Sequence, residues 1–261
     1  MSESRFDKEL AELDALKGRL ATLQPLNKAE IRRLREDFMI ENTYNTNAIE
    51  GNKLTLRETA LVLMEGMTIA GKPLKDHLEA VGHREAFEYM VGIADTGELL
   101  TERIIKEIHT LVLMNDTQHK GTYRGVPVIV RGALHTPPQP YLVAPQMETL
   151  FTDYDNMKRD KHIIEAIAEF HLRFEGIHPF IDGNGRTGRL IINLELIKAG
   201  FLPVDIKFTD RDKYYICFDD YCGEKQTPDT LTKLIIDYEK HELERYIKIV
   251  EYANGEKKEC V

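Results

Sequence analysis

Residues 178–189, HPFIDGNGRTGR, determine how the rest of this 261-residue sequence is organised. One histidine, one aspartate, three glycines and two arginines lie within these twelve residues, and the apolar run LIINLELI, residues 190–197, follows at once. A segment that is apolar on nearly every side predicts a helix buried in the centre of a domain. The motif is therefore expected to form the loop that leads into a central helix.

The glycines and arginines of this loop predict an anion site. Gly183 and Gly185 let backbone N–H groups approach a ligand closely, and a helix N-terminus attracts negative charge. Glycine spacing alone is weak evidence, because DGNG also occurs in hairpins and calcium loops. Arg186 and Arg189 share one face of the first helical turn, where a cation opposes the helix dipole at about 0.3 to 1 kcal/mol. Ion pairs with carboxylates elsewhere are the alternative, but two arginines beside a glycine loop favour phosphates.

Asp182 and His178 add a candidate metal ligand and a candidate base to the anion site. A carboxylate beside bound phosphates requires a cation between them, and magnesium is commonly held in that way. The alternative role of Asp182 is a helix N-cap, which we disfavour because three residues are expected to separate it from the helix. A lone histidine is more often structural, yet His178 beside a phosphate and metal site fits a general base. The set predicts phosphoryl or nucleotidyl transfer.

Periodicity predicts helices through most of the chain. They cover residues 4–24, 28–41, 55–66, 74–94 and 102–113, resume from residue 145, include a four-turn helix that ends before GIHPF, and continue at 210–221 and 228–252. The β-branched run Val126–Val130 and the short run Tyr141–Val143 predict one β-hairpin. Prolines between the two runs place part of it at an open edge that can accept another chain's strand. The fold class is mainly α.

Composition limits the partners and the environment. The sequence has 35 basic and 44 acidic side chains, a formal charge of -9, which disfavours non-specific attraction to nucleic acid or an anionic membrane. Three cysteines without CxxC spacing predict neither a disulfide framework nor a zinc site. No stretch is long and apolar enough for a membrane span. We expect a cytoplasmic protein with no nucleic-acid or membrane partner.

The motif resembles the signature of the Fic family, HPFx[DE]GN[GK]RxxR, and matches it at every defined position. The resemblance implies a Fic-type helical core with a single β-hairpin flap and a protein adenylyltransferase that moves AMP from ATP to a Ser, Thr or Tyr hydroxyl. His178 would be the base and Asp182 the magnesium ligand. The phosphate-binding residues would be Gly183, Asn184, Gly185, Arg186, Thr187, Gly188 and Arg189, with Arg186 near the β-phosphate and Arg189 at the γ-phosphate.

The same resemblance implies a flap and an adenosine pocket. The flap would align a protein substrate by strand addition, and Val130, Arg131 and Gly132 would cover the nucleotide. Tyr214 and Tyr215 lie where related chains carry a tyrosine pair beside the adenosine. Adjacent helical residues point about 100° apart, so one tyrosine is expected to face the base and the other the core. Phe218 and Cys222 stand where some relatives have leucine and asparagine.

A second motif, TNAIEGN at residues 46–52, is similar to the family's inhibitory signature [ST]xxxE[GN]. The pattern is short, and a helix that ends at Glu50 with Gly51 as its C-cap explains it equally well. Both interpretations hold together if Glu50 pairs with Arg189 and so removes that arginine from the γ-phosphate. The enzyme would then be inhibited until another anion takes Arg189.

Taken together, these patterns predict three regions. They are an N-terminal helical region at 1–95 with the inhibitory helix at about 40–52, a catalytic core at 96–225 with the flap at 121–143, and a C-terminal helix and tail at 226–261. A homodimer and self-modification are compatible with the resemblance. Two alternatives stay open: removal of AMP or another nucleotidyl or phosphoryl transfer at this site, and a nucleotide-sensing module without turnover. A metal cluster of Glu165, Glu169, His171 and His178 is disfavoured, because His171 fits a hydrogen-bonded core residue.

Overall fold

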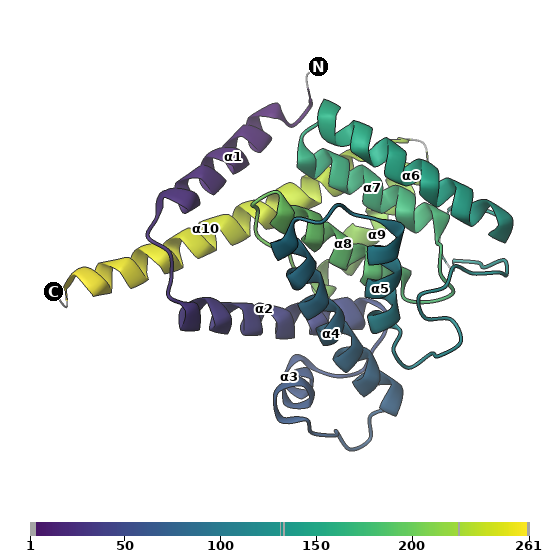
Figure 1. Cartoon of the computed structure of the whole chain (residues 1–261), viewed down its shortest axis with the longest axis horizontal. Coiled ribbons are helices and arrows are strands. Elements are labelled where there is room, and N and C mark those ends of the chain that lie inside the picture. Colours follow the sequence, from purple (N-terminus) through teal and green to yellow (C-terminus); the bar gives the residue numbers. More distant parts are fainter. Residues whose placement is uncertain (1–3, 131, 133, 224, 260–261) are drawn as a thin grey trace.

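The helix that follows the motif, α8 (Asn184–Lys198), lies at the centre of the chain (Figure 1). In this computed structural model, which describes residues 4–130, 132, 134–223 and 225–259, side chains along most of α8 are buried. Four helices contact it: α2 (Lys28–Ile49), α4 (Leu74–Thr96), α5 (Glu102–Val112) and α7 (Ile163–Ile177). The expected central helix is confirmed, because its apolar residues point outward on all sides and need neighbours everywhere.

The remaining helices enclose this centre. They are α1 (Asp7–Thr22), α3 (Leu56–Glu65), α6 (Pro140–Asp160), α9 (Arg211–Cys222) and α10 (Asp229–Glu259), with a 3-10 turn at Phe208–Asp210. The N-terminal helix α1 packs along α10, and α6 lies on α7. One buried apolar cluster contains residues from Phe6 to Leu243. The three regions expected from the sequence thus share a continuous core.

The boundaries of the helices around the motif differ from the expected ones. α7 runs through Gly176 to Ile177, although we expected it to end before GIHPF, and His178 terminates it in the left-handed region at φ 51°. Proline at 179 cannot continue a helix, so the stop falls there and not at the glycine. α8 begins at Asn184 with Gly183 as its N-cap at φ 77°, two residues earlier than expected. Gly185 and Arg186 therefore belong to the first helical turn.

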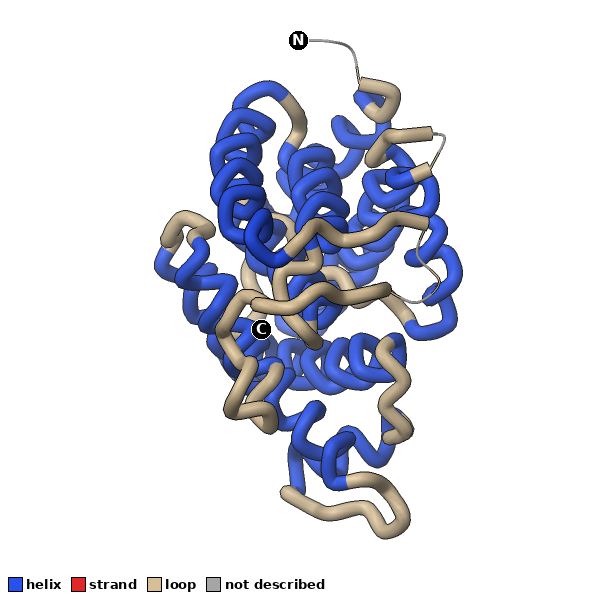
Figure 2. The backbone as a smooth tube through the Cα atoms, turned by 90° about the vertical axis from the view of Figure 1, so that its right-hand side faces the viewer, coloured by secondary structure: helices blue, strands red, loops and turns tan. Residues whose placement is uncertain are grey.

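The described residues between 121 and 139 form irregular loop segments, and none of the residues described there or elsewhere is in a strand. The expected second strand, Tyr141–Val143, is wrong, since α6 begins at Pro140 and includes it. Proline suits the first turn of a helix because its fixed φ is helical and its missing N–H has no partner there. Figure 2 shows the two loop segments that precede α6, before and after the residues drawn in grey. Arg131 lies outside the described residues.

Helix starts were predicted better than helix ends. The capping box at Thr55 and Glu58 is present at the start of α3, and Gly66 ends that helix in the left-handed conformation. α2 is one helix up to Ile49, so the expected end of this helix at residue 41 is wrong, and its last turns occupy the region expected for the inhibitory helix. Buried polar side chains between Asn42 and Asn47 pack against the core in this part of α2. The apolar periodicity of the sequence therefore does not reveal the helix there.

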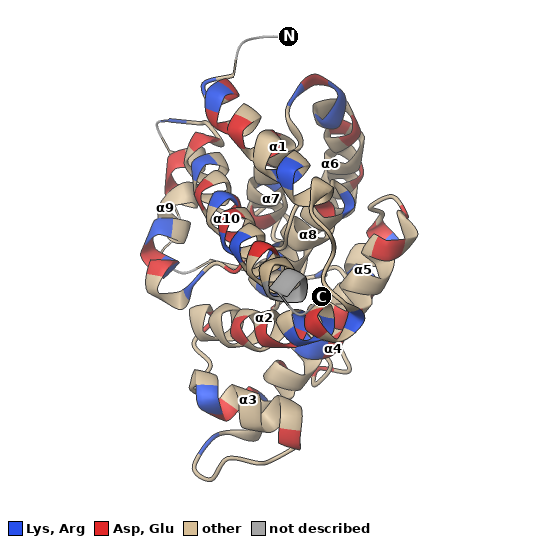
Figure 3. Cartoon of the chain, turned by 90° about the vertical axis from the view of Figure 1, so that its left-hand side faces the viewer, with Lys and Arg blue, Asp and Glu red and all other residues tan. Residues whose placement is uncertain are grey.

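Charge is distributed over the helices. Figure 3 shows acidic and basic residues interspersed along α9 and α10. No helix within the described ranges has the length and apolar character needed to cross a bilayer.

Candidate active site

The motif forms a closed loop between α7 and α8. The Asn184 side chain is buried and closes the loop back onto Phe180. Its Oδ1 accepts from Phe180 N and its Nδ2 donates to Phe180 O, both at 2.9 Å. Phe180 is fully buried and stacks on the His109 ring. The Asn184 side chain therefore shapes the loop, and the backbone N–H groups at the start of α8 are the ones available to an anion.

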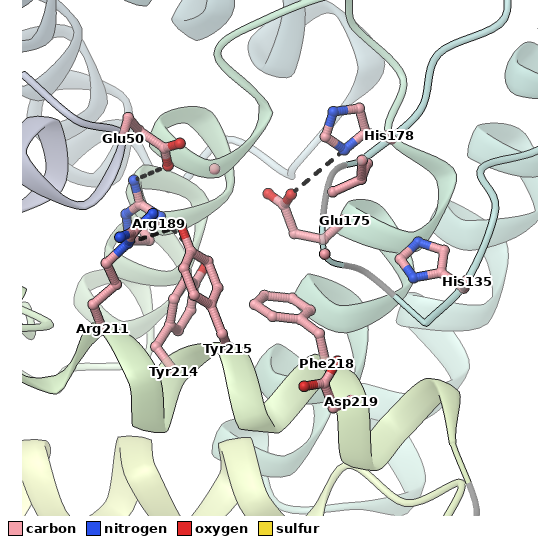
Figure 4. Close-up of a pocket in the computed structure, with 13 residues that line it drawn as sticks. Glu50, His135, Glu175, His178, Arg189, Arg211, Tyr214, Tyr215, Phe218 and Asp219 are labelled. Atoms are coloured by element: carbon pink, nitrogen blue, oxygen red, sulfur yellow. Dashed lines mark hydrogen bonds and ion pairs between the residues drawn. The ribbon is translucent and has the colours of Figure 1, made fainter.

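A cavity of about 280 Å³ opens beside this loop. Figure 4 shows Glu50 and Arg189 on one side, Glu175 and His178 on another, and Tyr214, Tyr215 and Phe218 rising from α9. Val130, Gly132, His135, Gly185, Arg211 and Asp219 complete the lining. The motif, the end of α2, the flap and α9 thus meet at one place. Cys222, expected at the adenosine, is half-buried and is not part of this lining.

His178 is held firmly and is uncharged near neutral pH. Its backbone carbonyl accepts a 2.8 Å hydrogen bond from Arg124 Nε. Burial lowers the pKa of the imidazole to about 4, although a hydrogen bond to the Glu175 backbone opposes the shift. A neutral ring has a nitrogen lone pair, which a proton acceptor requires. The geometry is compatible with the expected base.

Asp182 directly precedes the N-cap of α8, and its side chain is half exposed. Its Oδ1 accepts from Gly183 N at 2.6 Å and lies 3.3 Å from NH2 of Arg186. His109 donates from Nε2 to the Asp182 carbonyl, because its Nδ1 accepts from Gly121 N. No group of three or more potential ligands gathers among the described residues. A magnesium ion here would take its other ligands from phosphates and water, which is usual for this ion.

Arg189 is buried and paired with Glu50. Its NH2 lies 2.7 Å from Glu50 Oε1 and donates to the Thr46 carbonyl, and its Nε donates to Thr46 Oγ1 at 2.8 Å. Its NH1 lies 3.5 Å from the Tyr214 hydroxyl. Every nitrogen of the guanidinium thus has a partner. Thr46 was missed as a contact, although it opens the TNAIEGN motif.

Glu50 also covers the start of α8. A Cβ placed on Gly185 would lie 2.4 Å from Glu50 Oε1 and 3.0 Å from Arg189 NH1. Only glycine fits there while Glu50 keeps this position. The carboxylate therefore rests against the helix N-terminus where the sequence places an anion. Glu50 is also the C-cap residue of α2, and Gly51 follows at φ 94°, so the structural interpretation of the motif holds as well.

Arg186 lies behind the loop. It is 1% exposed, and its NH1 is 3.2 Å from Glu79 Oε1 of α4. The ion pair attaches α4 to the start of α8. A contact with the β-phosphate stays a prediction, as do the roles of the other phosphate-binding residues. Thr187 and Gly188 are buried, and a Cβ on Gly188 would lie 2.7 Å from both Glu175 Oε1 and the His171 ring.

The adenosine side is built on α9. Tyr214 is buried, with its hydroxyl 2.7 Å from Nε2 of His171, whereas Tyr215 is 37% exposed. Both tyrosines line the cavity, so burial distinguishes the two rings but does not assign one of them to the core alone. His171 is a hydrogen-bonded core residue, as expected. The contact of either tyrosine with a base stays a prediction.

Sequence reasoning missed five residues at the cavity or behind it: Arg124, His135, Glu175, Arg211 and Asp219. Arg124 is buried and donates to the carbonyls of Val126, Pro138, Ile177 and His178. It thereby joins both flap segments to the motif loop. Glu175 could have been noticed as an acid that lies three residues before His178; the other four carry no local signal.

A model of the Fic/DOC family matches residues 99–196. The chain is 36% identical over 216 residues to a protein adenylyltransferase Fic of Nematostella vectensis, covering 81% of this chain and 50% of the relative. It is 35% identical over 212 residues to the protein of that name in Drosophila willistoni, covering 80% and 42%. The chain thus spans about half the length of these relatives, or less.

Two solved structures have the same fold over nearly the whole chain. A Fic domain-containing signalling protein of Bacteroides thetaiotaomicron is 28% identical, with a TM-score of 0.81 over 94% of this chain and 97% of the other. Fic-1 of C. elegans, residues 134–508, is 30% identical, with a TM-score of 0.80 over 92% and 71%. Similarity in sequence and in fold therefore points to one family.

Proposed function

Because the chain belongs to the Fic/DOC family, we propose that it transfers AMP from ATP to a hydroxyl group of a protein. One observation carries the proposal: a neutral His178, Gly185 at the N-terminus of α8 and Arg189 line one cavity. The half-exposed carboxylate of Asp182 directly precedes the N-cap of the same helix. The relatives named protein adenylyltransferase support the same reaction.

The proposed reaction uses the chain's own groups in three roles. His178 accepts the proton of a Ser, Thr or Tyr hydroxyl as its oxygen attacks the α-phosphorus, and pyrophosphate leaves with the electrons of the broken P–O bond. The N–H groups at the start of α8 and the guanidinium of Arg189 bind phosphate oxygens. Magnesium held by Asp182 would neutralise part of the phosphate charge.

We further propose that Glu50 inhibits this reaction. Its carboxylate takes the guanidinium of Arg189 and lies against Gly185, at the place proposed for phosphate oxygens. Two anions cannot share one guanidinium face at hydrogen-bonding distance without strong repulsion. ATP therefore binds productively only when Glu50 leaves, and the native protein is expected to be weakly active.

The flap is the proposed docking site for the protein substrate. Its side chains Val126, Ile129 and Leu134 are exposed, although apolar. Extended backbone there can pair with a strand of the substrate by β-augmentation. Arg124 fixes the base of the flap next to His178, which would bring the docked hydroxyl to the base.

Transfer of label from α-labelled ATP tests the proposal. With magnesium and a mixture of candidate proteins, the Glu50→Gly protein should label protein at least tenfold faster than the native chain. γ-labelled ATP should give no label, since the γ-phosphate leaves with pyrophosphate. Glu65→Gly, an exposed glutamate at the end of α3, is the matched control and should behave as the native chain. No rise for a folded Glu50→Gly protein would refute inhibition by Glu50.

Adding His178→Ala to Glu50→Gly separates catalysis from nucleotide sensing. Label transfer should disappear while nucleotide affinity remains, because His178 acts on the hydroxyl. Equal activity with and without the imidazole would support the sensing module.

Removal of AMP is the second candidate function. Glu50 lines the same cavity as His178 and is about one-third exposed there, so it could orient a water molecule. An adenylylated protein offered to the native chain tests this: release of AMP that Glu50→Gly abolishes would assign the reverse reaction.

A further inference from the structure

The cavity contains a carboxyl group to which the proposed reaction gives no role. Glu175 belongs to the last turn of α7, three residues before His178, and its side chain is 12% exposed. In Figure 4 its carboxyl group points into the space between His178 and Arg189. It therefore lies between the proposed base and the arginine proposed to bind phosphate.

Glu175 has little to balance a negative charge. Its Oε1 accepts no hydrogen bond from any residue that the structure describes, and a Cβ on Gly188 would lie 2.7 Å from this atom. Its Oε2 is 3.9 Å from Nδ1 of His178, beyond hydrogen-bonding distance. The cation that lowers its pKa is Arg189, which Glu50 and Thr46 already hold.

The groups that face Glu175 come from every element around the cavity. They are Glu50 of α2, His135 of the flap, His171 of α7, His178 of the motif loop, Arg189 of α8, and Tyr214, Arg211 and Asp219 at or in α9. Burial lowers the pKa of all three histidines, so they are mostly neutral near pH 7. Two of the charged groups, Glu50 and Asp219, are carboxylates and would repel an ionised Glu175.

These surroundings favour the protonated acid. Burial raises the pKa of Glu175 to about 8; Arg189 opposes the shift and Glu50 adds to it. An ionised carboxylate would repel the phosphates proposed for this cavity, whereas a carboxylic acid is a strong hydrogen-bond donor. A bound phosphate would further favour the protonated form.

We propose that Glu175 binds the nucleotide as a neutral carboxylic acid, donating a hydrogen bond to a phosphate oxygen. This inference rests on the proposed nucleotide site and adds a binding residue to it. Affinity for nucleotide should then decrease as Glu175 loses its proton, a dependence that a merely structural residue would not produce.

Calorimetric titration with ADP and a fixed magnesium concentration tests the proposal. ADP lacks the γ-phosphate for which Glu50 competes, and its own phosphates are ionised above about pH 7.5. We expect the native chain to bind ADP about eightfold more weakly at pH 9 than at pH 7.5, since only the protonated form donates. Repeating the titration at pH 9 in buffers of different ionisation enthalpy should show uptake of nearly one proton.

The matched variant is Glu175→Gln, which keeps a hydrogen-bond donor of the same shape but cannot titrate. It should bind ADP as well as the native chain at pH 7.5, lose the decrease at pH 9 and take up no proton. Flat affinity of the native chain, or the same pH dependence in Glu175→Gln, would overturn the proposal. Should the variant not fold, proton uptake by the native chain decides alone.

These titrations are independent of AMP transfer. A Glu50→Gly protein that transfers no label would refute the proposed reaction and leave the role of Glu175 open to the same measurement. Conversely, active transfer with no titration of Glu175 would refute only this inference.

Discussion

Gly185 is the residue at which competition between Glu50 and phosphate can be measured without a substrate. Its backbone is helical, so alanine would be tolerated if nothing lay above it, but Glu50 Oε1 lies only 2.4 Å from the position of a Cβ. The contact makes the two residues energetically coupled. Coupled neighbours give non-additive stability changes.

We expect Gly185→Ala to lower the free energy of unfolding by about 1 to 3 kcal/mol, because the methyl group displaces Glu50 from Arg189. In a Glu50→Gly background the same change should lower it by less than half as much. Denaturant unfolding of the four proteins measures the coupling. Gly18→Ala is the control, since no atom lies near its Cβ position on α1, and it should raise stability by about 0.5 to 1 kcal/mol. Equal losses in both backgrounds would contradict the contact.

At the site, the sequence predicted which residues take part better than it predicted the surroundings of their side chains. Glu50 and Arg189 could be paired in advance because a motif resemblance names both. The burial of Arg186 against Glu79 could not be predicted, because that carboxylate comes from a helix about a hundred residues earlier. Glu175 was missed for the same reason: its burial depends on α8 and α9.

Among the elements, the flap has one side chain, that of Arg124, that joins both of its segments to the motif loop. With no ladder of hydrogen bonds within the described residues, it is held by the guanidinium of Arg124, which reaches carbonyls on both flap segments and on the motif loop. Removing that group leaves several partly buried carbonyls without a donor, and each such loss costs about 1 kcal/mol or more.

Arg124→Ala should therefore lower the free energy of unfolding by about 2 to 4 kcal/mol and speed amide exchange at residues 126–130 and 134–136. Arg124→Lys should give an intermediate result, because one ammonium cannot reach all four carbonyls. Denaturant unfolding and hydrogen exchange give the two readouts. Unchanged exchange in the flap of Arg124→Ala would show that other contacts hold it.

The flap also shows why local patterns were insufficient. The run Val126–Val130 has the composition of a strand, but a strand requires a partner, and the expected partner became the first turn of α6. Pro140 decides this, since proline favours a helix start as much as it disfavours a strand. The regular helices, by contrast, were located well because their apolar stripes face one core.

Across the whole molecule, a buried acid joins α10 to the segment that follows α8. Glu239 is fully buried, and its Oε1 accepts from Leu202 N at 2.9 Å. Burial raises the pKa of this carboxyl from 4.5 to about 8. Because the folded protein holds this proton more tightly than the unfolded chain, the contribution is complete below about pH 4.5 and is lost as the pH rises through about 8.

Glu239→Gln should consequently be more stable than the native chain by about 2 to 4 kcal/mol at pH 9 and equally stable at pH 5. Denaturant unfolding at both pH values checks this, with exposed Glu244→Gln on the same helix as the control. A difference that is the same at both pH values would mean that Glu239 is not protonated in the fold.

Oligomeric state stays a prediction; sedimentation of the native chain would test the expected homodimer.

The central claim is that Glu50 and the γ-phosphate compete for Arg189, and the ratio of ADP to ATP dissociation constants tests it most directly. Calorimetry of the native chain should give a ratio near one, because Glu50 holds the guanidinium that the γ-phosphate needs. In Glu50→Gly, ATP should bind at least tenfold more tightly than ADP, as expected for about 1.5 to 3 kcal/mol from a charge-assisted hydrogen bond. Adding Arg189→Ala should return the ratio to one. The same ratio in the native and Glu50→Gly proteins would contradict the account.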